Sequence, residues 1–287
     1  MTIDIIDTHQ HLIEPDRLDY LWPSKVNALA GRAFTYGDYR DASAGTGIAQ
    51  SIFMEADCED WKAETDMVLD MVADPRTDMI GVIANARPEF DDGFDAWLDR
   101  VTGTDVVGLR RILHETTDDV SQCDVFRANL RKLAARDLTF DINFLVRQLP
   151  IAADLVHAVD NVQFILDHCG VPDIKGGDDA PWRAGIKTLA GFPNVACKIS
   201  GITAYCAPGR ATLETLRPFI EHCIDCFGWD RVVWGSDWPV CNINCSIRDW
   251  TAISKAVVAS EDRANQEKLF RSNAIRVYGL RGLDSDG

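Results

Sequence analysis

The sequence lacks any apolar run long enough to cross a membrane. A transmembrane helix needs about 20 consecutive, mostly apolar residues, and the apolar runs of this chain are far shorter. Its first residues also lack the basic segment and apolar core of a secretion signal. From these two absences we expect a cytoplasmic protein.

Positive charge is also scarce. There are 29 lysines and arginines against 45 acidic residues, which gives a formal net charge of -16. A surface this negative repels phosphate backbones and anionic lipids, so we expect neither nucleic acid nor membrane as a partner. A small anionic ligand is not excluded, because a pocket can be locally positive. The sequence leaves open whether the chain forms a homo-oligomer.

Further absences concern phosphate loops and sulfur sites. No glycine-rich loop follows an early strand, which argues against a doubly wound dinucleotide-binding sheet. The nine cysteines are scattered, and no second Cys-x-x-Cys accompanies Cys223 and Cys226, so we expect reduced thiols rather than a four-sulfur zinc site. No linker rich in glycine, proline or serine divides the chain, which favours one domain.

What the sequence does have is an alternation of apolar runs and helical patterns. Eight short apolar or β-branched runs predict buried strands, and apolar residues at helical spacing between them predict helices. This alternation predicts an α/β protein, a single-domain (β/α)8 TIM barrel over residues 1–281, with a disordered tail at 282–287. The predicted strands are Ile3–Ile6, Gln50–Met54, Met79–Ala84, Val106–Leu113, Leu138–Phe144, Val162–Leu166, Val195–Ile199 and Arg231–Trp234. The predicted helices are Trp61–Val72, Phe90–Val101, Val125–Ala135, Pro150–Val159, Pro181–Leu189, Leu213–Phe227 and about Ser260 to Tyr278.

The first candidate for chemistry is Asp7-Thr8-His9-Gln10-His11, at the end of the first predicted strand. Because side chains alternate along a strand, His9 and His11 point to the same face. Two imidazoles placed in this way can hold one metal ion or flank one substrate, or they can simply be hydrogen-bonded near a turn. The segment from Leu12 to about Gly47 shows little periodicity and is expected to fold over the mouth of the barrel.

Polar residues follow most of the other predicted strands. Catalytic groups in a barrel come from the carboxyl ends of the strands, so these residues are candidates for a site. Each also has an ordinary structural interpretation, such as a helix cap, a satisfied buried carboxylate or a solvated charge. The candidates are Glu55, Arg110, Arg111, His114, Asp167, His168, Lys198, Asp237 and Trp238.

The chemistry that these residues could perform is hydrolysis. Imidazoles from strands one and six and a carboxylate from strand eight can bind one divalent metal ion, with zinc the expected ion for such ligands. The ion would lower the pKa of a water and polarise a carbonyl, and Asp237 would act as general base on that water. Arg110 or Arg111, with Lys198, would supply positive charge for a substrate carboxylate or a developing oxyanion.

Four motifs together carry a resemblance to a known family. They are Asp7-Thr8-His9-Gln10-His11, Leu166-Asp167-His168-Cys169-Gly170, Cys197-Lys198-Ile199-Ser200-Gly201 and Trp234-Gly235-Ser236-Asp237-Trp238-Pro239-Val240. The sequence resembles the amidohydrolase superfamily, and more narrowly its sugar-lactonase branch of fuconolactonases and rhamnonolactonases. The resemblance spans nearly the whole chain, and it implies a (β/α)8 barrel that hydrolyses a small lactone.

The resemblance also implies roles for particular residues. His9 and His11 would be metal or substrate ligands, His168 would lie beside the reacting carbonyl, and Asp237 would be the catalytic carboxylate and a metal ligand. Glu55 is a further candidate ligand. A two-metal site is not expected, because the fifth predicted strand has no histidine and the fourth no lysine. The branch includes members whose metal is dispensable, so the need for one is open.

Three alternatives remain at this stage. One is a metal-dependent decarboxylase of the same superfamily, and another is a lactonase for a muconolactone-type substrate. The third is a barrel that binds a ligand but has lost activity. The identity of the lactone would depend on the first loop and on side chains such as Trp61, His114, Tyr205 and Trp238.

Overall fold

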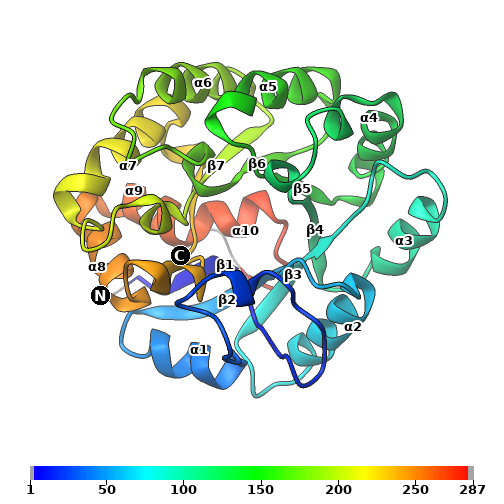
Figure 1. Ribbon diagram of the computed structural model, residues 1–287, viewed down its shortest axis with the longest axis horizontal. Coiled ribbons are helices and arrows are strands. Elements are labelled where there is room, and N and C mark those ends of the chain that lie inside the picture. Colours follow the sequence, from blue (N-terminus) through cyan, green and yellow to red (C-terminus); the bar gives the residue numbers. More distant parts are fainter. Residues whose placement is uncertain (1–2, 284–287) are drawn as a thin grey trace.

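The computed structural model describes residues 3–283 and contains eight parallel strands in the order β1 to β8. A parallel bridge between Gln10 and Trp238 joins β1 to the end of β8, so the sheet curves round on itself as a barrel (Figure 1). This architecture confirms the predicted (β/α)8 TIM barrel. The strands are β1 Ile5–Gln10, β2 Ile48–Met54, β3 Met79–Asn85, β4 Val106–Arg111, β5 Thr139–Ile142, β6 Phe164–Leu166, β7 Val195–Ile199 and β8 Val232–Trp234.

A ring of helices surrounds the strands (Figure 1). Each of the eight strands is followed by at least one helix, as the alternation in the sequence predicts. The helices are α1 Tyr36–Ser43, α2 Trp61–Val72, α3 Phe94–Val101, α4 Asp124–Arg131, α5 Leu149–Ala158, α6 Ala180–Ala190, α7 Leu213–Phe227, α8 Ile247–Val257, α9 Arg263–Glu267 and α10 Asn273–Val277, with a π-helical turn at Lys268–Ser272 between the last two.

The agreement with the sequence-based boundaries varies along the chain. Helices α2 and α7 begin and end as predicted, whereas α1 and α8 were not predicted at all. Strand β1 continues to Gln10, so His9 lies within the strand rather than after it. From residue 284 onward, the predicted disordered tail lies outside the described residues. No helix within residues 3–283 has the length and apolar character needed to cross a bilayer.

The C-terminal segment closes one end of the barrel. Apolar side chains of β1, β2, β3, β6, β7 and β8 form a compact cluster with the side chains of α10 and the residues after it. Helix α10 lies behind the strands in Figure 1, at their amino-terminal ends. Apolar side chains therefore fill the barrel interior at the amino-terminal ends of the strands. The main members of this cluster are Ile6, Ile52, Met54, Ile83, Ile165, Ala196, Val233, Ile275, Val277 and Tyr278.

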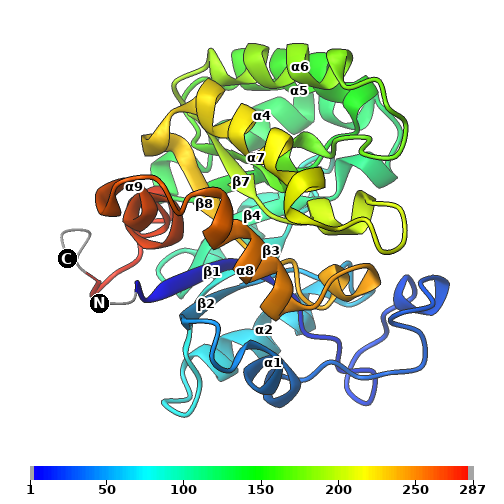
Figure 2. The same ribbon diagram turned by 90° about the vertical axis from the view of Figure 1, so that its left-hand side faces the viewer.

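The long connection between β1 and α1 lies at the carboxyl end of the barrel strands, as predicted (Figure 2). An antiparallel bridge joins Ile13 to Phe34, so the connection returns to its starting point. The indole nitrogen of Trp22 donates a hydrogen bond to the carbonyl oxygen of Ala56 at 2.7 Å, which ties the connection to the segment after β2. The connection therefore forms part of the wall around the barrel mouth.

Candidate active site

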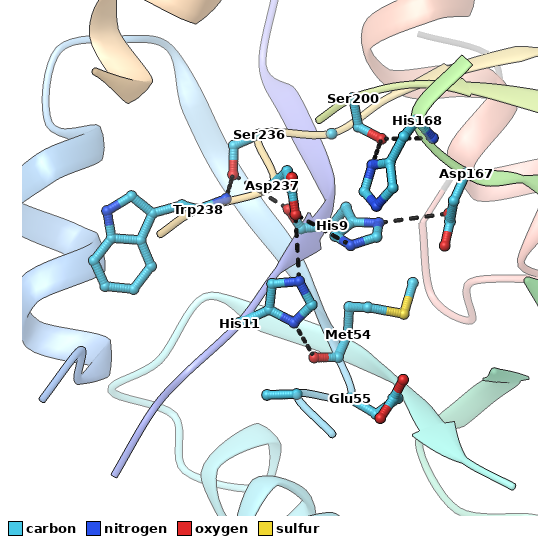
Figure 3. A network of polar contacts seen from close by, with 12 residues as sticks. His9, His11, Met54, Glu55, Asp167, His168, Ser200, Ser236, Asp237 and Trp238 are labelled. Carbon is cyan, nitrogen blue, oxygen red and sulfur yellow. Dashed lines mark hydrogen bonds and ion pairs between the residues drawn. The ribbon is translucent and has the colours of Figure 1, made fainter. Parts of the chain in front are cut away.

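Three histidines and one aspartate converge at the carboxyl end of the barrel (Figure 3). The Nε2 atoms of His9 and His11 lie 3.5 Å and 3.3 Å from Oδ1 of Asp237. The ring of His168 lies 4.6 Å from the ring of His9, centroid to centroid. All four residues are buried. Strands β1, β6 and β8, far apart in the sequence, thus bring their polar ends together.

Backbone hydrogen bonds hold Asp237 in place. Its N–H donates to the carbonyl oxygen of His9 at 2.7 Å, and its φ of 56° places it in the left-handed region, which aspartate adopts more readily than most residues. Next to it, the N–H of Ser236 donates to the buried carboxylate of Asp7 at 2.7 Å. Burial raises the pKa of Asp7 to about 6. Asp7 therefore joins β1 to the turn that carries Asp237.

The hydrogen bond of His11 determines which of its nitrogens carries a proton. Its Nδ1 lies 2.9 Å from the carbonyl oxygen of Met54, which can only accept, so Nδ1 carries a hydrogen. In a neutral imidazole, Nε2 is then an unprotonated acceptor, and it faces the carboxylate of Asp237 at 3.3 Å. Two acceptors at this distance need a proton or a metal ion between them.

His168 is fixed from two sides. It has a φ of 54°, and its Nδ1 lies 3.0 Å from the hydroxyl of Ser200 on the segment after β7. Gly201 packs against the ring, and a Cβ at that position would lie 2.2 Å from Nδ1 of His168. Burial lowers the pKa of His168, so the imidazole is neutral near pH 7. Only a glycine leaves room for this ring.

A layer of buried charged groups lies beneath the histidines. The ammonium group of Lys198 forms an ion pair with Asp141 and a second, at 3.0 Å, with Asp167, and all three side chains are fully buried. Nδ1 of His9 lies 3.4 Å from Nζ of Lys198 and 3.5 Å from Asp167. Lys198 therefore pairs with carboxylates in the barrel interior, and its role toward a substrate stays a prediction.

Arg110 and Glu55 pair with each other in the same way. Nε of Arg110 lies 2.7 Å from Oε1 of Glu55, and Nη2 donates to the carbonyl oxygen of Glu55 at 2.6 Å. The other carboxylate oxygen of Glu55 accepts from the amide of Asn85 at 2.7 Å. Burial raises the pKa of Glu55, but the charge of Arg110 and the hydrogen bonds from Asp57, Arg110 and Asn85 together outweigh burial, so the pKa is lowered. Nη1 of Arg110 also lies 3.4 Å from Nε2 of His9. The metal role of Glu55 and the substrate role of Arg110 stay predictions.

The remaining predicted substrate residues lie in different places. Arg111 faces outward and pairs with Glu89 at 3.0 Å, as expected for the neighbour of an inward-facing residue on a strand. Trp238 points away from the histidines and packs against Phe34 and Tyr39 (Figure 3). Neither side chain joins the histidine cluster, and their roles as substrate contacts stay predictions.

Trp61 lines a separate hollow between α2 and α3, about 280 Å³ in volume, together with Trp97 and Arg87. Its ring meets that of Trp97 edge to face, with centroids 4.7 Å apart. Trp61 thus does not join the histidine cluster. His114 follows β4 in a short 3-10 turn and is partly buried. Burial lowers its pKa, and the nearby His168 contributes to the lowering. His114 lies beside Asn143 at this end of the barrel, and its role as a substrate contact stays a prediction.

Several contributors to the site were not assigned a role from the sequence. Asp141 and Tyr278 are two of them: the Tyr278 hydroxyl donates to Oδ1 of Asp141 at 3.0 Å, so the C-terminal segment supports the charged layer. Ser200 and Asn143 are the others. The alternation of side chains on β5 and β7 was the available signal, because Asn143 lies two residues after Asp141 and Ser200 two residues after Lys198.

The donor set at the centre fits a divalent metal ion. Ligand atoms bound at about 2.0–2.1 Å in a tetrahedron lie about 3.3 Å apart, close to the 3.3 Å and 3.5 Å between Asp237 and the two β1 histidines. One nitrogen each of His9 and His168 and one oxygen of Asp237 all lie within 4.8 Å of one another. The Met54 carbonyl orients His11 as a carbonyl typically orients a metal-binding histidine. Glu55 is not part of this set.

The fold and this cluster define the class of protein. It is a (β/α)8 barrel whose histidines and aspartate gather at the carboxyl ends of the strands, where enzymes of this fold have their active sites. Residues 6–280 match the profile of the amidohydrolase family, and the chain belongs to that family. The resemblance predicted from the sequence is confirmed, and with it the hydrolase class.

Individual relatives are similar over nearly the full length. The chain is 26% identical to L-fucono-1,5-lactonase of Burkholderia ambifaria, covering 96% of this chain and 95% of the relative. It is 24% identical to a 2-pyrone-4,6-dicarboxylate hydrolase of Comamonas testosteroni, covering 95% and 89%. A crystal structure of an amidohydrolase from Burkholderia multivorans with bound zinc shares the fold, with a TM-score of 0.87, 24% identity and coverage of 96% and 99%.

Proposed function

We propose that this protein is a hydrolase that opens the ring of a small polar lactone. The observation that carries the proposal is the convergence of His9, His11 and His168 on one carboxylate, Asp237, at the carboxyl end of the barrel. The names of the relatives support it, because L-fucono-1,5-lactonases and a pyrone dicarboxylate hydrolase both act on cyclic esters. A sugar-acid lactone is the substrate that these relatives favour.

In this proposal Asp237 is the general base. Oδ1 faces the two histidines of β1, and the described residues give Oδ2 no hydrogen-bond partner, which leaves it free to accept a proton from water. The water oxygen forms a bond to the lactone carbonyl carbon, and the ring C–O bond then breaks. The proton held by Asp237 passes to the ring oxygen as it leaves, so the carboxylate is regenerated. When no metal ion is bound, Nε2 of His168 would face the carbonyl oxygen, because its Nδ1 faces Ser200.

His9, His11, His168 and Asp237 would hold a single divalent ion, with zinc the expected one. When bound, such an ion polarises a carbonyl oxygen and lowers the pKa of an adjacent water. The bound zinc of the amidohydrolase from Burkholderia multivorans supports this assignment. The alternative occupant between His11 and Asp237 is a proton, which would make the metal dispensable. Metal analysis and dialysis against a chelator distinguish the two.

A panel of lactones tests the proposal. The purified protein is incubated with aldonolactones, including L-fucono-1,5-lactone, and acid release is followed with a pH indicator after subtraction of spontaneous hydrolysis. Asp237→Asn should lower kcat by about 10²- to 10⁴-fold, the usual contribution of general acid–base catalysis. Asp225→Asn, on the exposed surface of α7, is the matched control and should leave kcat unchanged.

Failure of every lactone with a folded protein would reject the proposal. Release of carbon dioxide from an aromatic acid would instead support a decarboxylase. Binding of a lactone without turnover, unaffected by Asp237→Asn, would support a barrel that only binds its ligand. Turnover that persists in the metal-free protein would place the proton, rather than a metal ion, between His11 and Asp237.

A further inference from the structure

The hollow of about 280 Å³ between helices α2 and α3 lies outside the candidate active site. Trp61, the first residue of α2, and Gly93, which precedes α3, both line it, and Figure 1 shows the two helices as neighbours in the outer ring. In a (β/α)8 barrel each helix begins near the carboxyl end of the preceding strand, so the hollow lies at the same end of the barrel as the histidines. Among the described residues, its lining includes none of those histidines and not Asp237.

The walls of the hollow are mainly aromatic. The rings of Trp61 and Trp97 meet edge to face, with centroids 4.7 Å apart, and Phe90 and Phe94 complete the apolar lining. Phe90 is 60% exposed, so this wall presents apolar surface to solvent. A flat apolar ligand that covers these rings would be stabilised by the burial of apolar surface and by ring contacts.

Two buried nitrogens in these walls have no hydrogen-bond partner within the described residues. They are Nη1 of Arg87 and Nε1 of Trp97, a residue that is only 3% exposed. Cζ of Arg87 lies 6.0 Å from the centre of the Trp61 ring, which Trp97 also contacts, so both donors flank one indole. Guanidinium and indole N–H groups can only donate. Buried donors usually have a partner, so the group that completes this site must be an acceptor.

The charge of Arg87 is incompletely neutralised. Its ion-pair partner is Asp57, whose Oδ1 lies 3.9 Å from Nη2, beyond hydrogen-bond distance. Burial, together with the positive charge of nearby Arg111, lowers the pKa of Arg87 by more than the surrounding carboxylates raise it. A buried charge requires a counter-charge. An anionic acceptor would therefore be stabilised here more than a neutral one.

Lys62 and the start of α3 add to the positive potential of the hollow. Nζ of Lys62 lies 5.1 Å from the centre of the Trp61 ring and forms no ion pair with any described residue. Helix α3 begins after Gly93 without a side-chain cap, and the amino end of a helix attracts negative charge. Asp92, which is exposed, is the only acid among the described lining residues. The lining thus carries two cations against one carboxylate.

We propose that this hollow is a second ligand site, separate from the candidate active site, and that it binds a small carboxylate with an aromatic body. The ring of the ligand lies against Trp61 and Phe90. The carboxylate accepts hydrogen bonds from Nη1 of Arg87 and Nε1 of Trp97. This inference does not rest on the lactonase function, because the site shares no described lining residue with the histidine cluster.

Three probes separate the contribution of the ring from that of the charge. Phenylacetate has both features, 2-phenylethanol has the ring without the charge, and acetate has the carboxylate without the ring. Titration of the purified protein, followed by ligand-observed NMR, gives Kd for each probe. We expect phenylacetate to bind with a Kd of about 1 mM or below. The other two probes should bind at least about 10-fold more weakly, because each lacks one set of contacts.

Variants then locate the bound probe. Arg87→Met removes the charge and keeps an extended side chain, and it should weaken phenylacetate binding by at least about 10-fold. Trp97→Phe keeps a ring and removes the indole donor, and it should weaken binding by about 5-fold. Arg76→Met and Trp229→Phe are the matched controls, since neither residue lines the hollow, and both should leave Kd unchanged.

The outcomes distinguish this site from the catalytic one. Binding of phenylacetate that is lost in Asp237→Asn but unchanged in Arg87→Met would place the probe at the histidines and overturn the inference. Equal affinities for phenylacetate and 2-phenylethanol would overturn the anionic ligand class. Absence of phenylacetate binding at about 10 mM by the folded protein would overturn the site itself. None of these measurements requires turnover, so the lactonase proposal stands or falls by its own assay.

Discussion

Replacement of Lys198 by methionine tests the charged layer beneath the site. Lys198 is fully buried and neutralises two fully buried carboxylates, Asp141 and Asp167. Methionine keeps the length and removes the charge, so these carboxylates lose their shared cation. Breaking a buried ion pair in this way typically costs about 3–5 kcal/mol. Since a domain is stable by about 5–15 kcal/mol, Lys198→Met should be folded but markedly weakened.

Urea unfolding, followed by tryptophan fluorescence and circular dichroism, measures the loss. Thermal unfolding of the same variant should show a fall in Tm of about 10 °C, because a large domain shifts by about 2–4 °C per kcal/mol. Lys187→Met, on the exposed face of α6, should change stability by less than about 0.5 kcal/mol. Adding Asp141→Asn to Lys198→Met removes one stranded charge and should restore at least about 2 kcal/mol.

Two results would refute this reasoning. A loss below about 1 kcal/mol in Lys198→Met would mean that the ammonium group is not the counter-charge of a buried layer. A large rise in KM with unchanged stability would mean that Lys198 reaches the substrate, as the sequence predicts. The double variant is informative in either case, since a substrate contact gives no reason for Asp141→Asn to restore stability.

Two further predictions concern the packing around His168 and a buried carboxyl group. Gly201→Ala should lower kcat/KM by about 100-fold, because the new Cβ would displace the His168 ring, whereas Gly209→Ala, with a similar positive φ but open space, should retain activity. Glu64→Gln should stabilise the protein at pH 8 by at least about 1.4 kcal/mol, the free energy of one pKa unit. Burial, with a contribution from nearby Glu55, raises the pKa of Glu64 well above its usual value. The folded protein therefore loses stability as pH rises from the pKa of Glu64 in the unfolded chain to its higher pKa in the folded protein. Urea unfolding at pH 4 and pH 8 should show the gain in stability of Glu64→Gln only at pH 8. The control Glu59→Gln, at an exposed position, should show no gain at either pH. Equal stability of Glu64→Gln and the parent protein at pH 8 would contradict the argument.

The sequence was most informative where a repeating pattern is long. Helices α2 and α7 each extend over three or more turns with regular apolar spacing, and both were predicted to the residue. Helices α1 and α8 were missed, although local signals were present. Thr35 with Asp38 caps α1, and the Ser246 hydroxyl accepts from the third residue of α8. These Ser/Thr-x-x-Asp patterns identify helix starts that weak periodicity hides.

Side-chain alternation predicted direction correctly but not depth. His9 and His11 share a face, and one of the neighbours Arg110 and Arg111 faces inward, as expected. Inward positions two residues apart differ in depth by about 6.6 Å, enough to separate a residue at the mouth from one in the interior. Lys198 lies in the interior and Ser200 near the mouth, but the sequence pattern predicts only that both face inward near the end of a strand.

The sequence also could not show which charged side chains pair with one another. Glu55 has the chemistry of a metal ligand, and only the three-dimensional arrangement shows that Arg110 and Asn85 use its oxygens. A buried charge requires a counter-charge, so inward-facing acids and bases from different strands must be matched before any is assigned to a substrate. Their matching depends on the depth and the rotamer of each side chain inside the barrel, which one sequence does not fix.

The pairing of charged side chains inside the barrel determines which charges remain at its mouth. Interior carboxylates neutralise Lys198 and Arg110 one layer below the histidines, so neither cation remains for a ligand. The charge at the mouth is then set by Asp237 together with the proton or metal ion that must separate it from His11. The pairing inside the barrel, and not the overall charge of the protein, therefore determines which charges face a ligand at the mouth.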